Sequence, residues 1–186
     1  MSPLLLRPAL LSDVPQLVGL VNAAYRGDES RMGWTTEAEL LGGQRTDPDS
    51  LAALIEPPDR VVLIAEGPTD TARLAAIGCV HLERVLPRQG AYLGMLTIRP
   101  SGQARGLGSA LLSGAEAHAR AAWGALIVRM TVIAQRSELI AWYERRGYAR
   151  TGETAPFPYG DPRFGLPKRD DLSFVILEKP LSATGH

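Results

Sequence analysis

The sequence contains little cysteine and no long apolar run. Its single cysteine, Cys79, excludes an internal disulfide and is typical of a protein in a reducing compartment. No stretch reaches the roughly 18 apolar residues of a membrane-spanning helix, so we expect neither such a helix nor a membrane partner. The apolar run 4–6 is interrupted by Arg7 and lacks the basic flank and small-residue cleavage site of a secretory leader. These absences predict a cytoplasmic protein.

The sequence has no excess of positive or negative charge, and its formal net charge is 0. Lys and Arg total 20, Asp and Glu total 20, and no basic run is present, so no nucleic-acid partner is expected. No His, Cys, Asp or Glu cluster has the spacing of metal ligands, so no metal is expected. The length of 186 residues and the apolar fraction of 45% are ordinary for one globular domain. We expect that domain to span residues 1–180, followed by a flexible tail at 181–186.

Apolar periodicity, capping residues and turns predict alternating strands and helices. Apolar runs and alternation indicate strands at residues 4–7, 61–65, 74–85, 92–98, 126–133 and 172–177. Helical spacing and cap residues indicate a first helix that begins at Ser12 or Asp13. Further helices are indicated at residues 36–43, 49–55, 105–122 and 136–146. A loop rich in Pro and Gly is expected from 154 to about 168. The order, which ends in one or two strands after the last helix, predicts a mixed α/β sheet with helices on both faces.

A glycine-bearing loop, Gln103-Ala104-Arg105-Gly106-Leu107-Gly108, lies between a predicted strand and the longest predicted helix. Such a loop suits an anion, because its N–H groups are unpaired and the helix dipole favours negative charge there. No Lys-Ser/Thr pair follows the glycines, as a Walker A loop needs, and the third glycine of a dinucleotide fingerprint is missing. Ordinary packing at a helix start remains the alternative to phosphate binding.

Two motifs in the sequence resemble those of one family. Ile98-Arg99-Pro100-x-x-Gln103-x-x-Gly106-x-Gly108 resembles motif A of the GNAT superfamily of N-acetyltransferases, with its Q/R-x-x-G-x-G/A signature. Ala141-Trp142-Tyr143-Glu144-Arg145-Arg146-Gly147-Tyr148 resembles the second signature, a Tyr on a helix that ends in Gly and an aromatic residue. The order of elements also agrees from residue 4 to 177. The resemblance implies a single-domain GNAT-like α/β fold, with a mixed, mostly antiparallel sheet and splayed central strands.

The resemblance also implies which residues bind acetyl-CoA, the expected co-substrate. The pyrophosphate would lie on the backbone N–H groups of Gln103, Ala104, Arg105, Gly106, Leu107, Gly108 and Ser109. The pantetheine arm would pair with the open strand edge at Leu96, Thr97 and Ile98. Arg136 stands where many members carry Asn, and it could contact a CoA phosphate or be solvated.

The resemblance implies that Tyr143 is the general acid that protonates the departing CoA thiolate. A phenol with a pKa near ~10 is protonated at neutral pH and can serve this purpose. The alternative is a core aromatic, since Leu139 and Ile140 share its helical face. The expected base is Glu83, assisted by His81 on the same strand face, or ordered water. A solvated strand end is the alternative for Glu83.

The resemblance implies that one wall of the acceptor site lies in or beside the first helical region, which carries Tyr25, Arg31, Trp34 and Arg45. The 156–168 loop, with Phe157, Tyr159 and Phe164, could form another wall. A solvated or core role is the alternative for each of these residues. Trp142 is expected to pack in the core. The sequence thus predicts an N-acetyltransferase in which the amine attacks acetyl-CoA within a ternary complex, with a small-molecule acceptor favoured. A non-catalytic acyl-CoA sensor and an enzyme acting on protein N-termini or lysines are the alternatives, and a homodimer is compatible with the sequence.

Overall fold

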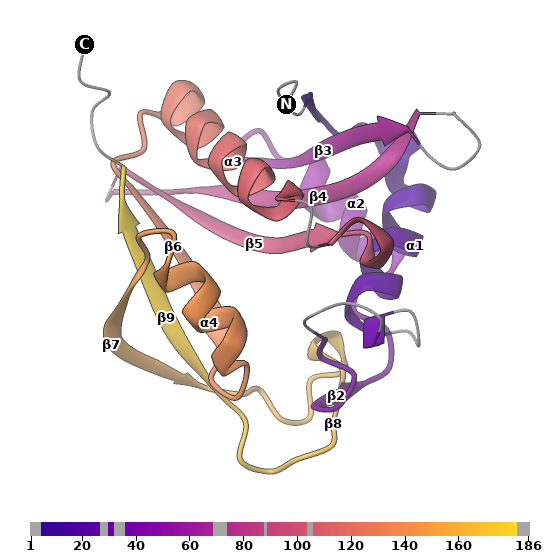
Figure 1. Ribbon diagram of the computed structural model, residues 1–186, viewed down its shortest axis with the longest axis vertical. Coiled ribbons are helices and arrows are strands. Elements are labelled where there is room, and N and C mark those ends of the chain that lie inside the picture. The colour runs from indigo at the N-terminus through magenta and orange to yellow at the C-terminus, as the bar shows by residue number, and fades with distance from the viewer. Residues whose placement is uncertain are drawn as a thin grey trace.

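The sheet and its covering helices form one α/β unit (Figure 1). The computed structural model describes residues 5–26, 30–31, 36–68, 74–87, 89–103 and 106–181. The strands of its seven-stranded sheet are β1 (Leu6–Pro8), β3 (Arg60–Pro68), β4 (Leu74–Val85), β5 (Gly90–Ile98), β6 (Ile127–Ile133), β7 (Ala149–Pro156) and β9 (Ser173–Pro180). Their order across the sheet is β1-β3-β4-β5-β6-β9-β7. Among the described strands every pairing is antiparallel except β5–β6, which confirms the predicted fold class.

The helices cover both faces of the sheet because its strands alternate apolar residues toward two cores. On β4, Val80 and Leu82 face the core that holds α3 (Leu107–Trp123) and α4 (Ser137–Glu144). Cys79 faces the opposite core, which α1 (Val14–Tyr25) and α2 (Pro48–Ile55) cover. Burial there raises the pKa of the Cys79 thiol to about 12, as expected for a structural thiol. Within the described residues, no helix is long and apolar enough to cross a membrane.

The central strands β5 and β6 diverge after a short parallel pairing. Their register runs only from Gly90↔Ile127 to Tyr92↔Arg129, and beyond Tyr92 the strands separate, as Figure 1 shows. The edge of β5 from residue 93 to 98 is therefore not paired with β6. This confirms the predicted splay, and it leaves backbone groups available on the β5 edge.

A bulge interrupts the other edge of β5 at the same level. Cys79 pairs with Thr97 and His81 with Gly94, so Met95 and Leu96 lie opposite a single β4 residue. Met95 has φ +53°, a left-handed conformation that is strained for a side chain of this type. Bulges bend a strand and redirect its backbone groups. The bulge therefore lies where β5 leaves β6.

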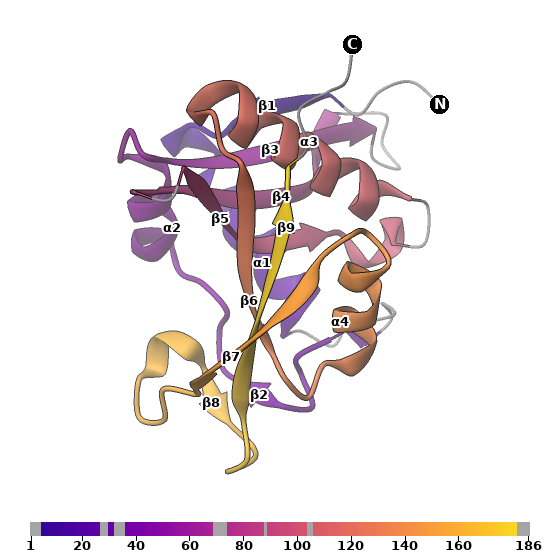
Figure 2. The ribbon, with the colours of Figure 1, turned by 90° about the vertical axis from the view of Figure 1, so that its left-hand side faces the viewer.

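Residues 36–43, predicted as a helix, form a turn and a short strand. The N–H groups of Leu40 and Leu41 both donate to the Glu37 carbonyl, and the chain then pairs as β2 (Leu41–Gly42) with β8 (Leu166–Pro167). The helix prediction was wrong because long-range pairing outweighed the local capping pattern. β2 and β8 lie side by side at the end of the molecule opposite α3 (Figures 1 and 2).

The end of the chain also differs in detail from the prediction. The sequence left one or two strands open after the last helix and began a loop at residue 154, whereas the edge strand β7 runs to Pro156. No strand pattern marks β7, because its residues are mostly polar and exposed and it contains Gly152 at φ +84°. β9 continues to Pro180, three residues beyond the predicted end of the last strand at residue 177. Leu181 then donates its N–H to the Leu126 carbonyl and packs on the core, and 182–186 lie outside the described residues.

Candidate functional site

Two cavities meet where β5 and β6 diverge. The larger has a volume of about 700 Å³ and lies toward α2, β2 and the 157–164 segment. The smaller, of about 230 Å³, lies against the start of α3 and the side of α4. The residues that line both cavities are Tyr25, Leu96, Arg136, Leu139 and Tyr143. Molecules bound in the two cavities would therefore touch at these five residues.

The first turn of α3 forms one wall of the smaller cavity. Gly106 precedes the helix with φ +77°, and no side chain caps the helix start. A Cβ on Gly106 would meet no atom within 4 Å, so the space above it is open. The N–H groups of Leu107, Gly108 and Ser109 lack intrahelical acceptors because they belong to the first turn. This arrangement fits an anion such as a pyrophosphate.

Most residues expected to bind acetyl-CoA come together at the smaller cavity. Those that line it are Leu96, Thr97, Ile98, Gln103, Gly106, Gly108, Ser109 and Arg136. The side chain of Leu107 packs against the core instead, so only its backbone could serve a ligand. Ala104 and Arg105 lie outside the described residues. The residues named from the sequence motifs therefore share one cavity, and their binding of acetyl-CoA stays a prediction.

Trp142 and Arg146 also line the smaller cavity and were not predicted as site residues. The Arg146 guanidinium carbon lies 3.6 Å from the centre of a Trp142 ring, and its Nε donates to the Ser109 hydroxyl at 2.9 Å. A Cβ on Gly108 would come within 3.3 Å of Trp142. Trp142 therefore closes one side of the cavity as well as packing on the core. The signal in the sequence is the Trp142–Arg146 spacing of i, i+4 on one helix face.

Tyr143 lies at the junction of the two cavities and is 5% exposed. Its ring packs edge-on against Trp142 and Tyr148, with centroid distances of 5.0 and 5.7 Å. Burial, followed by the neighbouring Tyr25, raises the pKa of Tyr143 well above its ordinary value. Its phenol therefore stays protonated over the whole physiological range and can donate a proton.

The backbone of Leu96 lies at the same junction. The Tyr25 hydroxyl donates to the Leu96 carbonyl at 2.8 Å, which joins α1 to the β5 edge. The Thr97 hydroxyl donates to the Met95 carbonyl at 2.9 Å and helps to hold the bulge. The open β5 edge and Tyr143 thus line the two sides of one narrow space.

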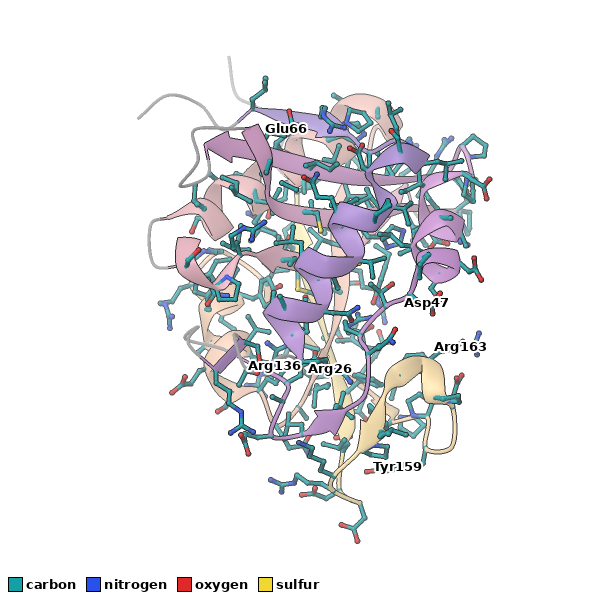
Figure 3. The ribbon with its side chains drawn as sticks, turned by 90° about the vertical axis from the view of Figure 1, so that its right-hand side faces the viewer. Arg26, Asp47, Glu66, Arg136, Tyr159 and Arg163 are labelled. Atoms are coloured by element: carbon teal, nitrogen blue, oxygen red, sulfur yellow. The ribbon has the colours of Figure 1, made fainter. Side chains whose placement is uncertain are left out.

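A buried carboxylate and two arginines form the base of the larger cavity. Glu37 accepts from Arg136 at 2.9 Å and from Arg26 at 3.1 Å, with side-chain exposures of only 8%, 9% and 5% respectively. Figure 3 shows Arg26 and Arg136 beside each other below α1. Burial, partly offset by Glu37, lowers the pKa of Arg26. Arg136 is thus ion-paired and not solvated, and this cluster joins α4 to the 37–42 segment.

The two predicted proton acceptors are placed differently. His81 lines the larger cavity, is buried, and its Nε2 has no hydrogen-bond partner among the described residues. Burial and the nearby Arg60 lower the pKa of His81 to about 4, so its ring is neutral at physiological pH. Glu83, two residues along the same strand face, lines neither cavity and pairs with Arg60 at 3.4 Å. In the described part of the chain no three His, Cys, Asp or Glu residues form a metal site.

Of the residues predicted for the walls of the acceptor site, some line the larger cavity and others do not. Those that line the larger cavity are Tyr25, Arg45, Phe157 and Phe164. Arg31 instead pairs with Glu39 at the surface, the Tyr159 hydroxyl donates to the Arg169 carbonyl, and Trp34 lies outside the described residues. Sequence reasoning missed Arg26 and Glu37, which no local motif marks.

Comparisons with known proteins agree with this geometry. Residues 17–148 match the family model described as Acetyltransferase (GNAT) family, whereas no curated relative matches the sequence significantly. An N-acetyltransferase from Staphylococcus aureus Mu50 is similar in structure, with a TM-score of 0.69, 16% identity and coverage of 97% of this chain and 100% of that chain. The ribosomal-protein-alanine N-acetyltransferase from Brucella melitensis is also similar, with a TM-score of 0.67, 19% identity and coverage of 96% of this chain and 100% of that chain.

A third structure, yncA from Salmonella typhimurium with its cofactor acetyl-CoA, gives a TM-score of 0.65 and 18% identity, covering 100% of this chain and 98% of that chain. At these identities the three structures support the fold alone. The family match spans well over half of the sequence and includes both predicted signatures. The chain therefore belongs to the GNAT family of acetyltransferases, enzymes that use acetyl-CoA.

Proposed function

We propose that this acetyltransferase transfers an acetyl group to the amine of a small molecule, with both substrates bound together. The observation that carries the proposal is that two cavities meet at Tyr143 and Leu96. The smaller cavity would hold the CoA moiety and the larger the amine. A non-catalytic acyl-CoA sensor would not need a protonated phenol at such a junction.

The residues of the smaller cavity fit acetyl-CoA by their chemistry. The uncapped N–H groups at the start of α3 would hold the pyrophosphate, and the open edge at Leu96, Thr97 and Ile98 would pair with the pantetheine amides. When bound, acetyl-CoA supplies an activated acetyl thioester. N–H groups of β5 at the bulge would polarise its carbonyl, and the Tyr143 hydroxyl would give its proton to the departing thiolate.

Proton removal from the amine needs an acceptor on the side of the larger cavity. His81 is the proposed relay, because it lines the larger cavity and its Nε2 lacks a hydrogen-bond partner in the described structure. The burial that keeps its ring neutral also makes it a weak base, so it would pass the proton on to water and not retain it. Ordered water would connect it to the amine, since no described contact joins His81 to the junction. Glu83 would act only through a longer water path, because its carboxylate is paired with Arg60.

The walls of the larger cavity favour a small acceptor over a protein. The 162–168 segment is tied to the 37–42 segment by the β2–β8 pairing and by the Lys168 N–H to the Leu40 carbonyl, and to the end of α1 by Arg26, which donates to the Phe164 carbonyl. Phe164 lies on this tied segment, packs edge-on against Phe157, and both line the larger cavity. An extended peptide would have to pass beside this segment, whereas a small amine fits within the cavity.

Acetyl-CoA binding is the first test of the proposal. At 100 times its dissociation constant, acetyl-CoA should stabilise the fold by about 2.7 kcal/mol, which corresponds to a rise in Tm of roughly 5–11 °C. Thiol release with a panel of small amines, measured against peptides with free N-termini or lysines, then tests the acceptor class. Absence of a thermal shift would refute the assignment of the smaller cavity, and faster turnover of peptides would refute a small acceptor.

Gly106→Val should weaken acetyl-CoA binding at least about tenfold, because its side chain would enter the open space above the first turn of α3. The matched control is Gly124→Val at the other end of α3, about 25 Å away by helix length. Gly124 also has a positive φ, +62°, and open space at its Cβ. Both variants should lose about 1–2 kcal/mol of stability, but only the first should lose affinity. Equal affinities in calorimetry would show that this turn does not hold the pyrophosphate.

A further inference from the structure

We infer that the acceptor is an amine that also carries an anionic group, and that Arg45 is the residue that binds this group. The inference rests on the proposed function, because it names the class of acceptor for the larger cavity. Two observations support it: arginines outnumber carboxylates in the lining of that cavity, and the guanidinium of Arg45 has no hydrogen bond or ion pair among the described residues.

The described lining of the larger cavity has an excess of positive charge. Its charged members are four arginines, Arg26, Arg45, Arg136 and Arg163, and two carboxylates, Glu37 and Asp47. Both carboxylates already have partners in the protein. Glu37 is bound by two of the arginines, and Asp47 accepts from the Ser50 N–H and hydroxyl at the start of α2. Glu37 is therefore neutralised within the protein, whereas Asp47 accepts only from uncharged donors and keeps its charge; the four arginines still outnumber the two carboxylates of the lining.

Arg45 differs from the other three arginines. Arg26 and Arg136 are paired with Glu37, and Arg163 is paired with Asp161 and projects from the 162–164 turn (Figure 3). The guanidinium of Arg45 has no hydrogen bond or ion pair among the described residues. Its described interaction is a cation–π contact with the Tyr25 ring, whose centre lies 5.3 Å from the guanidinium carbon. Arg45 thus presents unused donors to the cavity.

The backbone that carries Arg45 is held in place from α1. The Asn22 side-chain oxygen accepts from the N–H groups of Arg45 and Thr46 at 2.7 and 3.1 Å, and its amide donates to the Thr46 carbonyl at 2.9 Å. A loop fixed by three hydrogen bonds positions its side chain with less loss of entropy on binding. Asn22 is therefore a positioning residue for Arg45.

The position of Arg45 relates the anionic group to the reacting amine. Tyr25 contacts Arg45 through its ring and reaches the Leu96 carbonyl through its hydroxyl. Arg136 lies near the same ring, at 5.7 Å, and lines both cavities. An anion at Arg45 would thus lie beside the Tyr25 ring, which itself lines both cavities. An amine that carries its anionic group only a few bonds away could reach the junction from there, whereas a polyamine would be repelled by the arginines.

The test compares amines that differ only in the anionic group. The probes are each proteinogenic α-amino acid beside its α-amide, phosphoethanolamine beside ethanolamine, and spermidine, with thiol release measured at saturating acetyl-CoA. At least one anionic member should exceed its neutral partner about tenfold or more in kcat/KM. The carboxylate and phosphate pairs distinguish the two kinds of anion.

Substitution of Arg45 identifies the residue. Arg45→Gln should remove the preference for the anionic member, mainly through KM, while the KM for acetyl-CoA and the thermal shift with acetyl-CoA stay unchanged. Arg45→Lys should retain part of the preference because it keeps the charge. The control is Arg150→Gln, since Arg150 lies on β7 outside both cavities and pairs with Glu144 at the end of α4; this variant should keep the full preference.

The outcomes separate this inference from the proposed function. If neutral amines or spermidine react as fast as the anionic members, or if Arg45→Gln keeps the preference, the inference is wrong while the transferase remains. If no amine releases thiol, the proposed function fails and the inference fails with it. If the preference is present and only the Arg45→Gln variant loses it, both are supported.

Discussion

Replacing Tyr143 by Phe is expected to lower kcat for acetyl transfer by about 10²–10⁴-fold, the usual contribution of a positioned general acid. The hydroxyl lies where the two cavities meet, and burial keeps it protonated. Without it the thiolate would have to leave unprotonated or take its proton from water. The expected change is in kcat, with the dissociation constant of acetyl-CoA altered less than about threefold, as measured by thiol release and calorimetry.

The matched control is Tyr148→Phe, a second buried tyrosine whose ring touches that of Tyr143. The Tyr148 hydroxyl donates to Glu116 at 2.9 Å, and Lys179 donates to the same carboxylate. This variant should lose about 1–3 kcal/mol of stability and keep its turnover. Tyr143→Phe should keep its stability, because the ring and its packing on Trp142 remain. An unchanged kcat in Tyr143→Phe would remove this residue as the acid.

The pH profile supplies a second measurement on the same group. The acceptor must be a neutral amine to attack, so kcat/KM should rise as the pH approaches the pKa of that amine. The proposed mechanism uses the acid form of Tyr143, and the pKa of Tyr143 lies above its ordinary value near ~10. Deprotonation of Tyr143 should therefore cause no loss of rate below about pH 10. If kcat/KM of the unaltered protein fell with rising pH below about pH 10, and Tyr143→Phe lacked this fall, the assignment would be contradicted.

The half of the site that the sequence predicted is encoded locally. The strand, the loop at 103–108 and the start of α3 are continuous in the chain, so their spacing carries the geometry of an anion site. The motif that carries Tyr143 is likewise local, because the turn after α4 closes with the Tyr148 N–H donating to the Tyr143 carbonyl. Backbone groups at fixed positions on regular elements need few long-range contacts to be placed. Local sequence patterns therefore describe this half well.

The other half depends on contacts between distant segments. Glu37 and Arg136 are 99 residues apart, and Arg26 and Phe164 are 138 residues apart. No periodicity or cap signal joins such residues. The Thr36-x-x-Glu39 pattern predicted a helix. In the structure Glu37, within that pattern, forms ion pairs with Arg26 and Arg136, and the chain continues into β2. The acceptor side is thus formed by tertiary structure, which explains why its residues were only partly predicted.

Glu37→Gln is expected to destabilise the fold by about 3–5 kcal/mol, because it leaves two buried arginines without their counter-charge. For a chain of this length the corresponding fall in Tm is roughly 6–20 °C. The 37–42 segment should loosen first, since Arg26 also donates to the Gly42 carbonyl and ties this segment to α1. Thermal unfolding, with hydrogen exchange at Leu40 and Leu41, measures both effects.

The control for this prediction is Glu39→Gln, two residues away. Glu39 pairs with Arg31 at the surface, where both side chains are more than half exposed, and such pairs add little to stability. Its Tm should stay close to that of the unaltered protein. The two variants remove the same charge from the same segment, so a difference between them reports burial and not net charge. If Glu37→Gln lowers Tm by less than about 2 °C, the buried cluster does not hold the wall of the acceptor cavity, and the closed acceptor side would need another cause.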